Sequence, residues 1–212
     1  LTKYLNGHGD ALGGAIIGPE DGIMRIRKEM LVHLGGVLSP FNAWLILRGL
    51  VTLSMRCERH NQSAMEIARF LENHPKVKRV LYPGLESHPH HALASQQMMG
   101  YGGMISFQLK GGMGAAIDMA ESIRISSYAT SLGHAHSLLF YYPTDLYVDA
   151  VPYLTAGQKM RIREWTGDGI LRASVGLENV NDLIADLDRS LKTRTFKGMV
   201  GPLAYKVLKQ RL

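Results

Sequence analysis

The first ten residues, Leu1-Thr-Lys-Tyr-Leu-Asn-Gly-His-Gly-Asp10, decide the fold, because they place a lysine in a glycine-rich segment. Glycine recurs from here to about residue 53, at Gly7, Gly9, Gly13, Gly14, Gly18, Gly22, Gly35, Gly36 and Gly49. Glycine permits tight turns and close approach of the backbone to a neighbouring group. This density of glycine therefore predicts a region whose backbone packs closely around a neighbouring group.

Short regular elements are expected inside this region. Residues 15–18, Ala-Ile-Ile-Gly, indicate a short buried strand that leaves the glycine-rich loop. Apolar residues then recur at helical spacing over residues 23–34, which predicts one amphipathic helix.

A long helical stretch follows. Ser39-Pro40 is typical of a helix start, with serine as the N-cap and proline at the first helical position. Apolar residues keep helical spacing up to His74-Pro75, where proline ends the pattern. Because this is long for one globular helix, we expect a bend near Gly49 or a bridge between two domains.

The pattern after residue 75 alternates between strands and helices. Strands are predicted at residues 77–82, 104–109 and 172–177, and helices at 92–99, 115–124 and 182–191. Such alternation with short connections predicts an α/β fold for this second region.

The composition is that of an ordinary globular protein. The chain has 212 residues, of which 46% are hydrophobic and 20% charged, which excludes a disordered or collagen-like chain. No apolar stretch is long enough to span a membrane, and the opening residues do not match a signal or transit peptide. The net charge of +6 comes without a basic cluster interleaved with aromatic residues, so we expect no nucleic-acid partner. The single cysteine, Cys57, suits a reducing, cytoplasmic location and is expected to be a buried structural thiol.

Other motifs are weak. Gly112-Met-Gly-Ala-Ala imitates the start of a dinucleotide-binding loop, but a third glycine and a following acidic residue are missing. His88, His90 and His91 have no second group at metal-ligand spacing, so we interpret them as a surface loop and expect no metal site.

The lysine segment resembles a known family. Thr2-Lys3-Tyr4 followed by Asn6-Gly-His-Gly-Asp10 is similar to the lysine element of the pyridoxal-phosphate enzymes of cysteine and methionine metabolism, the group of methionine γ-lyase, cystathionine γ-lyase and γ-synthase. Further segments of the family follow in order up to about residue 191: Leu38-Ser-Pro-Phe-Asn-Ala-Trp-Leu, Arg48-Gly-Leu-Val-Thr-Leu, Arg59-His, Phe70-Leu-Glu-Asn-His-Pro-Lys-Val, Tyr82-Pro-Gly-Leu, Ser87-His-Pro, Ser131-Leu-Gly and Leu171-Arg-Ala-Ser-Val-Gly-Leu-Glu178.

The resemblance implies a fold-type I (aspartate-aminotransferase-like) α/β enzyme. Residues 1–54 would be the C-terminal part of the large cofactor-binding domain, and residues 55–212 the small C-terminal α/β domain. The resemblance also implies a homotetramer built of active-site dimers.

The resemblance also implies roles for four residues. Lys3 would form the Schiff base with pyridoxal 5′-phosphate and then move protons on the substrate, chemistry that suits a lysine whose ammonium can lose its proton. Thr2 would donate its hydroxyl to the cofactor phosphate. Arg172 would hold the α-carboxylate of a small amino-acid substrate with its planar fork, and Ser131 would contact the same carboxylate.

The implied reaction is γ-elimination on a γ-substituted amino acid, as in methionine γ-lyase. The alternatives are γ-replacement, as in cystathionine γ-synthase or O-acetylhomoserine sulfhydrylase, and a noncatalytic domain. The family lysine lies midway along a chain about twice as long. We therefore expect this sequence to be the C-terminal half of such an enzyme and to be inactive alone.

One segment departs from the family pattern. Where the lyases continue with a Pro-Ala-x-Met-Thr-His type of element, this chain reads Phe140-Tyr-Tyr-Pro-Thr-Asp-Leu-Tyr-Val-Asp149. Aromatic rings and carboxylates suit a cationic leaving group, so the segment suggests a canavanine-like substrate or, less well, a homoserine ester. The alternative is a surface loop with packed tyrosines and solvated aspartates.

Overall fold

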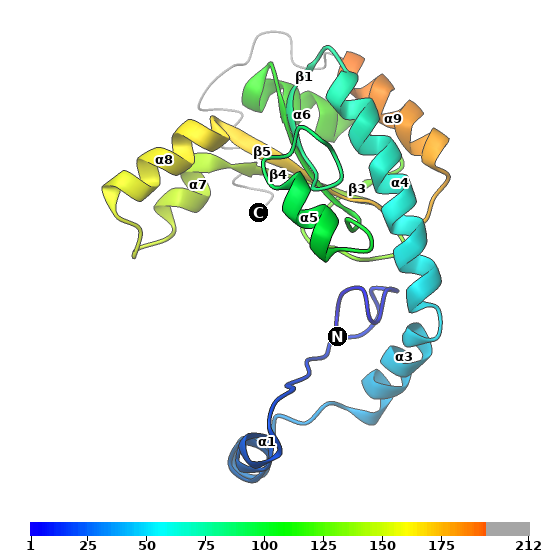
Figure 1. Ribbon diagram of the computed structural model, residues 1–212, viewed down its shortest axis with the longest axis vertical. Coiled ribbons are helices and arrows are strands. Elements are labelled where there is room, and N and C mark those ends of the chain that lie inside the picture. Colours follow the sequence, from blue (N-terminus) through cyan, green and yellow to red (C-terminus); the bar gives the residue numbers. More distant parts are fainter. Residues whose placement is uncertain (194–212) are drawn as a thin grey trace.

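A mixed five-stranded sheet forms the centre of the protein. The computed structural model describes residues 1–193 and shows the sheet in the order β1-β2-β5-β4-β3, that is, Val77–Leu81, Met104–Leu109, Gly169–Ser174, Leu138–Pro143 and Ser127–Tyr128 (Figure 1). Neighbouring strands are antiparallel except β3 and β4, which are parallel. The fold is therefore α/β, as predicted.

The register of the strands separates the two faces of the sheet. Phe107 on β2 lies opposite Leu171 on β5, which lies opposite Tyr141 on β4, and all three are buried. Because side chains alternate along a strand, Arg172 and its partner Phe140 lie on the other face. The sheet thus packs one face into the core and presents an arginine beside the buried Phe140 on the other.

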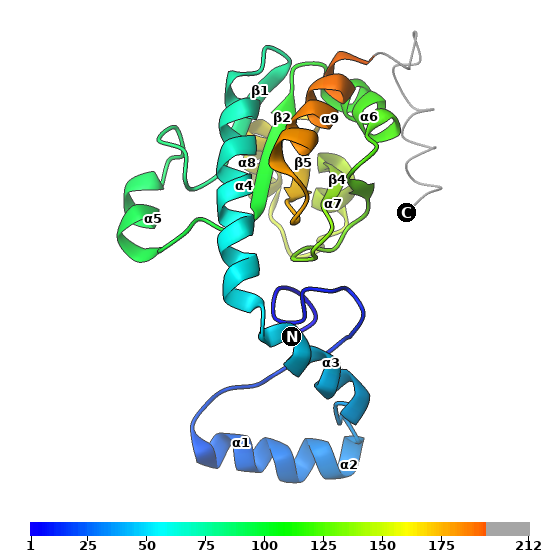
Figure 2. The same cartoon turned by 90° about the vertical axis from the view of Figure 1, so that its right-hand side faces the viewer.

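Helices α4 (Leu53–Asn73), α6 (Gly112–Ser122) and α9 (Val180–Lys192) cover the buried face (Figure 2). Each carries apolar residues at helical spacing: Ala64, Ile67, Ala68 and Leu71 on α4, Ala116 and Met119 on α6, and Leu183, Leu187 and Leu191 on α9. These side chains and the strands form one core, whose burial supplies the main driving force for folding.

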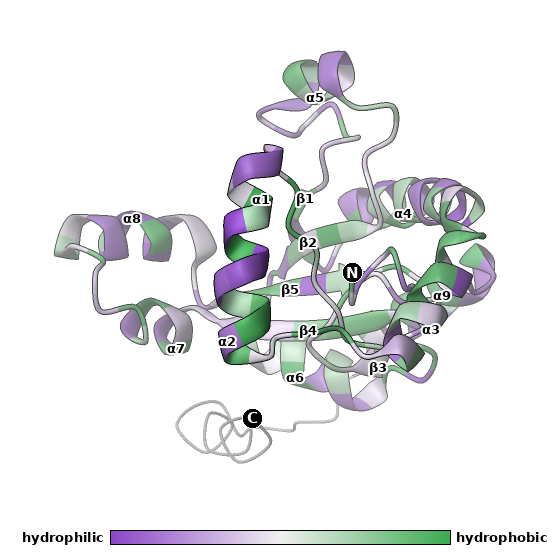
Figure 3. Cartoon of the chain, turned by 90° about the horizontal axis from the view of Figure 1, so that it is seen from below, coloured by the Kyte–Doolittle hydropathy of each residue, from purple (hydrophilic) through white to green (hydrophobic). Residues whose placement is uncertain are grey.

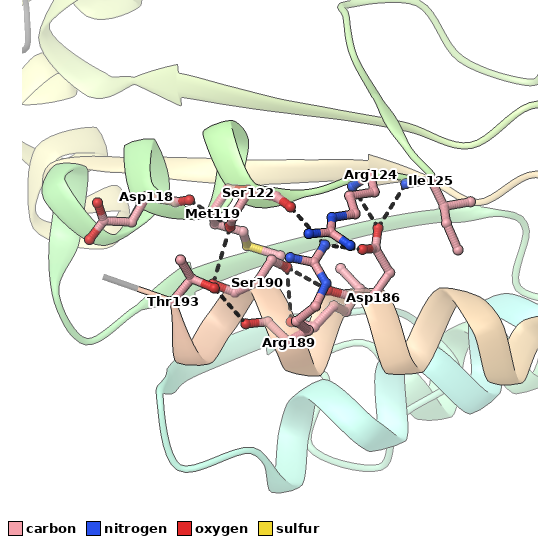
Figure 4. Close-up of polar contacts among 10 residues, drawn as sticks. Asp118, Met119, Ser122, Arg124, Ile125, Asp186, Arg189, Ser190 and Thr193 are labelled. Atoms are coloured by element: carbon pink, nitrogen blue, oxygen red, sulfur yellow. Dashed lines mark hydrogen bonds and ion pairs between the residues drawn. The ribbon is translucent and has the colours of Figure 1, made fainter. Parts of the chain in front are cut away.

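A buried carboxylate joins α9 to the segment after α6. Asp186 accepts hydrogen bonds from the backbone N–H groups of Arg124, at 2.9 Å, and Ile125, at 2.8 Å (Figure 4). It is also bonded to Arg189, which donates to the carbonyl oxygen of Ser122 at 2.7 Å. The carboxylate therefore supplies hydrogen-bond acceptors to two backbone N–H groups that lie outside the helices and strands.

The long helical stretch is divided, as the bend expected near Gly49 requires. Helix α3 (Pro40–Leu50) begins with Ser39 as its N-cap, whose Oγ accepts from the N–H of Asn42 at 3.1 Å. Two residues separate the end of α3 from the start of α4. A Cβ at Gly49 would overlap the carbonyl oxygen of Asn6, so glycine allows the lysine loop to lie against α3.

The N-terminal region differs from the prediction in one element. Residues 15–18 form no strand, and Ile16 and Ile17 are 68% and 96% exposed, so the expected buried strand is wrong. The helix predicted over residues 23–34 is present but begins at residue 20 and is divided into three consecutive elements, α1 (Glu20–Ile26), the π-helix η1 (Arg27–Leu31) and α2 (Val32–Leu34). None of their residues is buried, and Figures 1 and 2 show them projecting away from the sheet.

The other predicted elements are present with small shifts at their ends, and α5 is His91–Gln97. Residues 140–149 are not the loop of the alternative interpretation, because they form most of β4 and then α7 (Thr144–Asp149). The rest of that interpretation is confirmed, because Tyr141 is buried and Asp145 and Asp149 are exposed. Helix α8 (Ala156–Thr166) was also missed, although Thr155 and Gln158 form the capping box that its sequence could have revealed. No helix within residues 1–193 combines the length and hydropathy needed to cross a bilayer.

Candidate active site

Lys3 lies in a compact loop that the first turns of the chain form. The N–H of Gly7 donates to the carbonyl oxygen of Lys3 at 2.8 Å, and the N-terminal amine bonds to the carbonyl oxygen of Gly13 at 2.9 Å. Gly7 has a φ of 73°, in the left-handed region that glycine adopts at little cost. Its carbonyl oxygen accepts from the N–H of Ala135 at 2.8 Å, which ties the loop to the α/β region.

A buried arginine from α4 holds this loop in place through backbone carbonyl groups. Arg56 Nη1 donates to the carbonyl oxygen of Tyr4 at 2.8 Å, and Nη2 donates to those of Leu5 at 3.4 Å and Gly49 at 2.7 Å. Arg56 was missed in the sequence. One signal was available: Arg56 and His60 continue, at helical spacing, the apolar stripe of α4. Polar side chains in such a stripe are rarely buried without a specific partner.

Three side chains meet at the Lys3 amine. Lys3 Nζ donates to Ser131 Oγ at 2.8 Å, and Ser131 Oγ lies 3.1 Å from His134 Nε2. Ser131 and His134 come from the loop between β3 and β4, more than a hundred residues away from the lysine. The sequence predicted Lys3 and Ser131 as site residues but missed His134.

Arg172 approaches the same loop from β5. Its Nη2 donates to the carbonyl oxygen of Ser131 at 3.3 Å, and its Cζ lies 4.7 Å from the centre of the Tyr142 ring. Within residues 1–193 the guanidinium forms no ion pair with a carboxylate. It therefore remains available to an external carboxylate.

A cavity of about 430 Å³ lies beside Lys3. It is lined by Thr2, Lys3, Ser131 and His134, together with Asp10 and Asn42 among others. The structure thus brings three of the four predicted site residues to one cavity. Arg172 is not in its wall and reaches it through Ser131.

Thr2 is engaged within the loop. Its Oγ1 donates to the carbonyl oxygen of Gly13 at 3.2 Å and accepts from the Gly13 N–H at 3.0 Å. The single hydroxyl proton of Thr2 is donated to the carbonyl oxygen of Gly13, so this hydrogen bond would have to break before Thr2 could donate to a phosphate. Its role at a phosphate stays a prediction.

The carboxylates of the departing segment already have a cationic partner. Arg163 from α8 donates to Asp145 and to Asp149, each at 2.9 Å. Figure 1 shows α7 and α8 at the end of the sheet away from the N-terminal loop. These ion pairs join α7 to α8, and a role of the two aspartates at a substrate stays a prediction.

The arrangement suits a carbonyl compound and a carboxylate. A lysine whose bonded partner is a neutral hydroxyl can lose its proton and bond to a carbonyl carbon. A nearby unpaired guanidinium can orient a carboxylate with two parallel hydrogen bonds. In the described part of the chain, no group of three or more His, Cys, Asp or Glu side chains is arranged to hold a metal ion.

Comparison with known proteins agrees with this chemistry. The family model described as "Cys/Met metabolism PLP-dependent enzyme" matches residues 1–192. An L-methionine gamma-lyase of Fusobacterium nucleatum subsp. polymorphum is 42% identical over 193 residues, 91% of this chain and 47% of that protein. A canavanine gamma-lyase of Pseudomonas canavaninivorans is 44% identical over 199 residues, 93% of this chain and 48% of that protein.

A solved structure is also similar. The crystal structure of cystathionine gamma synthase from Xanthomonas oryzae pv. oryzae, in complex with aminoacrylate and cysteine, aligns with a TM-score of 0.76 and 40% identity. The alignment covers 90% of this chain and 48% of that one. The chain spans about half the length of the proteins that it matches.

Proposed function

Because the chain belongs to the family of pyridoxal-phosphate-dependent enzymes of cysteine and methionine metabolism, we propose that the protein eliminates the γ-substituent of an amino acid, as a methionine γ-lyase does. The observation that carries the proposal is the contact of Lys3 Nζ with Ser131 Oγ beside the unpaired Arg172. It supports the proposal because an amine that can bond to a carbonyl cofactor lies next to a guanidinium that can bind a substrate carboxylate.

The residues present fit pyridoxal phosphate, the cofactor of this family. Lys3 lines a cavity of about 430 Å³, and its amine forms no ion pair with a carboxylate within residues 1–193. Lys3 would hold the cofactor through Nζ, and Thr2 would reach its phosphate. When bound, the cofactor withdraws electrons from the substrate and so makes its carbon-bound hydrogens acidic.

The protein residues supply orientation and proton transfer. Arg172 would bind the substrate carboxylate, and its stacking on Tyr142 limits the directions in which the guanidinium can point. Ser131 would contact the same carboxylate. Lys3 Nζ, once released by the substrate, would take a proton from one substrate carbon and deliver it to another.

γ-Replacement is the second candidate within the family. Cystathionine gamma-synthase from Mycobacterium leprae is 39% identical over 190 residues. Elimination and replacement begin with the same proton removals, so Lys3 and Arg172 serve both reactions equally well.

A cationic substrate is a third candidate. It is favoured by the similarity to the canavanine gamma-lyase, and not by Asp145 and Asp149, which are paired with Arg163. If it is used, its cationic end must be recognised by other groups.

A substrate panel tests these candidates. The intact native protein, loaded with pyridoxal phosphate, would be given methionine, cystathionine, O-acetylhomoserine and canavanine. Release of ammonia and a 2-oxo acid indicates elimination, whereas consumption of an added thiol into a thioether product indicates replacement. The absence of turnover for every γ-substituted amino acid would contradict the proposed function.

We also propose that the protein works as a cytoplasmic homotetramer of active-site dimers. Large apolar side chains are exposed along the N-terminal region, including Ile17 at 96%, Val51 at 81% and Leu34 at 75%. Figure 3 shows hydrophobic and hydrophilic bands alternating along α1 and α2. Exposed apolar surface of this kind favours contact with another protein surface, whether of a second subunit or of the rest of the protein. Sedimentation equilibrium of the native protein measures the assembly, and a monomer would contradict it.

A further inference from the structure

His134 lines the cavity of Lys3 but has no part in the function proposed above. Its imidazole is held between Ser131 Oγ, 3.1 Å from Nε2, and the backbone at Gly9, where a Cβ would lie 3.1 Å from Nδ1. The same Ser131 Oγ lies 2.8 Å from Lys3 Nζ. One hydroxyl therefore joins an amine to an imidazole.

The directions of these hydrogen bonds follow from the chemistry of the groups. A lysine ammonium can only donate, so Ser131 Oγ accepts from it. A serine hydroxyl has one proton, which is then free for His134 Nε2. His134 Nε2 is therefore the acceptor at the end of a chain that runs from Lys3 through Ser131.

The surroundings keep His134 neutral. Burial lowers the pKa of its imidazole below the usual value, and the positive charge of Lys3 and the neighbouring His136 lower it further. The other charged groups near the site are Asp10, in the wall of the same cavity, and Arg172, bonded to the backbone of Ser131. The Nε2 lone pair is therefore open to the hydroxyl proton of Ser131, and the lowered pKa means that His134 holds that proton less tightly than a free imidazole would.

We propose that His134 accepts, through the Ser131 hydroxyl, the proton that Lys3 must lose to react. The Nζ–H bond of Lys3 breaks as an O–H bond forms on Ser131, and the original hydroxyl proton passes to His134 Nε2. Lysine becomes a neutral amine, histidine an imidazolium, and serine is unchanged. The proposal rests on the proposed function, in which Lys3 must be unprotonated when it bonds to a carbonyl carbon or takes a proton.

The first test needs neither cofactor nor turnover. In the cofactor-free intact protein, deuterium exchange at the imidazole Cε1–H, followed by mass spectrometry over a pH series, gives an apparent pKa for each histidine. We expect the His134 midpoint to lie below about 6.5 and to rise in Lys3→Met, because a positive charge is removed. A His134 midpoint that is the same in wild type and Lys3→Met would overturn the proposal.

The second test uses the pH profile of kcat/KM in the loaded enzyme. In His134→Gln the amide oxygen can still accept from Ser131, but the side chain no longer takes up a proton. We expect kcat/KM to fall about 100-fold near neutral pH and the acidic limb of the profile to move. His136→Gln is the matched control, because His136 bonds to Ser127 and Glu178 and not to Ser131. It should stay close to wild type.

The outcomes separate the two proposals. A His134→Gln profile that superimposes on the wild-type profile would overturn the role of His134 while leaving the proposed function intact. Failure of the wild type on every substrate of the panel would contradict the proposed function, and the cofactor-free titration would still decide whether His134 and Lys3 are coupled.

Discussion

Replacing Asp186 by alanine should destabilise the protein far more than replacing an exposed aspartate of the same helix. The Asp186 side chain is 5% exposed and accepts from two backbone N–H groups, those of Arg124 and Ile125. Leaving a buried donor without an acceptor costs about 1–3 kcal/mol, so two donors cost about 2–6 kcal/mol. Arg189 is 36% exposed and adds little, because water replaces its partner. The expected loss is a large part of a typical unfolding free energy of about 5–15 kcal/mol.

The assay is urea unfolding of the intact protein, with Asp188→Ala as the matched control. Asp188 lies two residues further along α9, is 34% exposed and pairs with Lys192 at 2.6 Å and His74 at 3.4 Å. The exposed Lys192 pair contributes about 0–1 kcal/mol. The His74 pair adds to this because its imidazole is buried, but Asp188→Ala leaves no buried backbone donor without an acceptor and should cost less than Asp186→Ala.

The pH dependence gives a second check. Burial raises the pKa of the Asp186 carboxyl, but the donors Ile125, Arg124 and Arg189 outweigh burial and leave the pKa below its usual value. A lowered pKa in the folded state adds stability above the unfolded value of about 3.9, and this stability is lost as the pH falls through the folded value. The difference in stability between wild type and Asp186→Asn should therefore shrink below about pH 4. Equal urea midpoints for Asp186→Ala and Asp188→Ala, or a difference that persists unchanged in acid, would refute this reasoning.

Further predictions concern the site. Lys3→Ala should leave the urea midpoint nearly unchanged but abolish covalent cofactor attachment, measured as cofactor mass on the peptide of residue 3 after borohydride reduction; attachment to another lysine would contradict it. Arg172→Lys should lower kcat/KM for every amino-acid substrate, because a point charge replaces a planar fork worth about 1.5–3 kcal/mol; an unchanged kcat/KM would place the arginine outside the substrate site. Gly49→Ala should lower Tm, because its Cβ overlaps the Asn6 carbonyl oxygen, whereas Gly22→Ala, with nothing within 4 Å, should raise Tm slightly. A higher Tm for Gly49→Ala would show that the lysine loop can move away at no cost.

The sequence predicted the buried elements well because an element that packs one face against the core repeats its apolar residues at a regular spacing. β2 was predicted with both ends correct, and the stripes of α4 and α9 identified their core residues. Residues 15–18 failed because an apolar run also occurs where a chain is exposed, as Ile17 is. β4 was missed because its burial is nearly continuous, and such a strand shows no alternation.

The site was predicted only where a motif marked it. Lys3, Ser131 and Arg172 lie within segments that resemble the family, and the structure brings them together. His134 and Arg56 act through contacts with residues far along the chain, which local spacing cannot reveal. The proposed domain boundary at residue 54 lies just inside α4, and residues 194–212 lie outside the described residues.

The position of β5 has a consequence for how the protein is made on the ribosome. Among the described strands it is synthesised last, yet it lies in the middle of the sheet between β2 and β4. Until it emerges, β1–β2 and β3–β4 are separate pairs with unpaired inner edges, which are open to association with other chains. Arg172 is on this strand, so its insertion joins the two halves of the sheet and delivers the proposed carboxylate-binding group in the same event. A nascent chain stalled before residue 169 therefore lacks both the central strand of its sheet and Arg172.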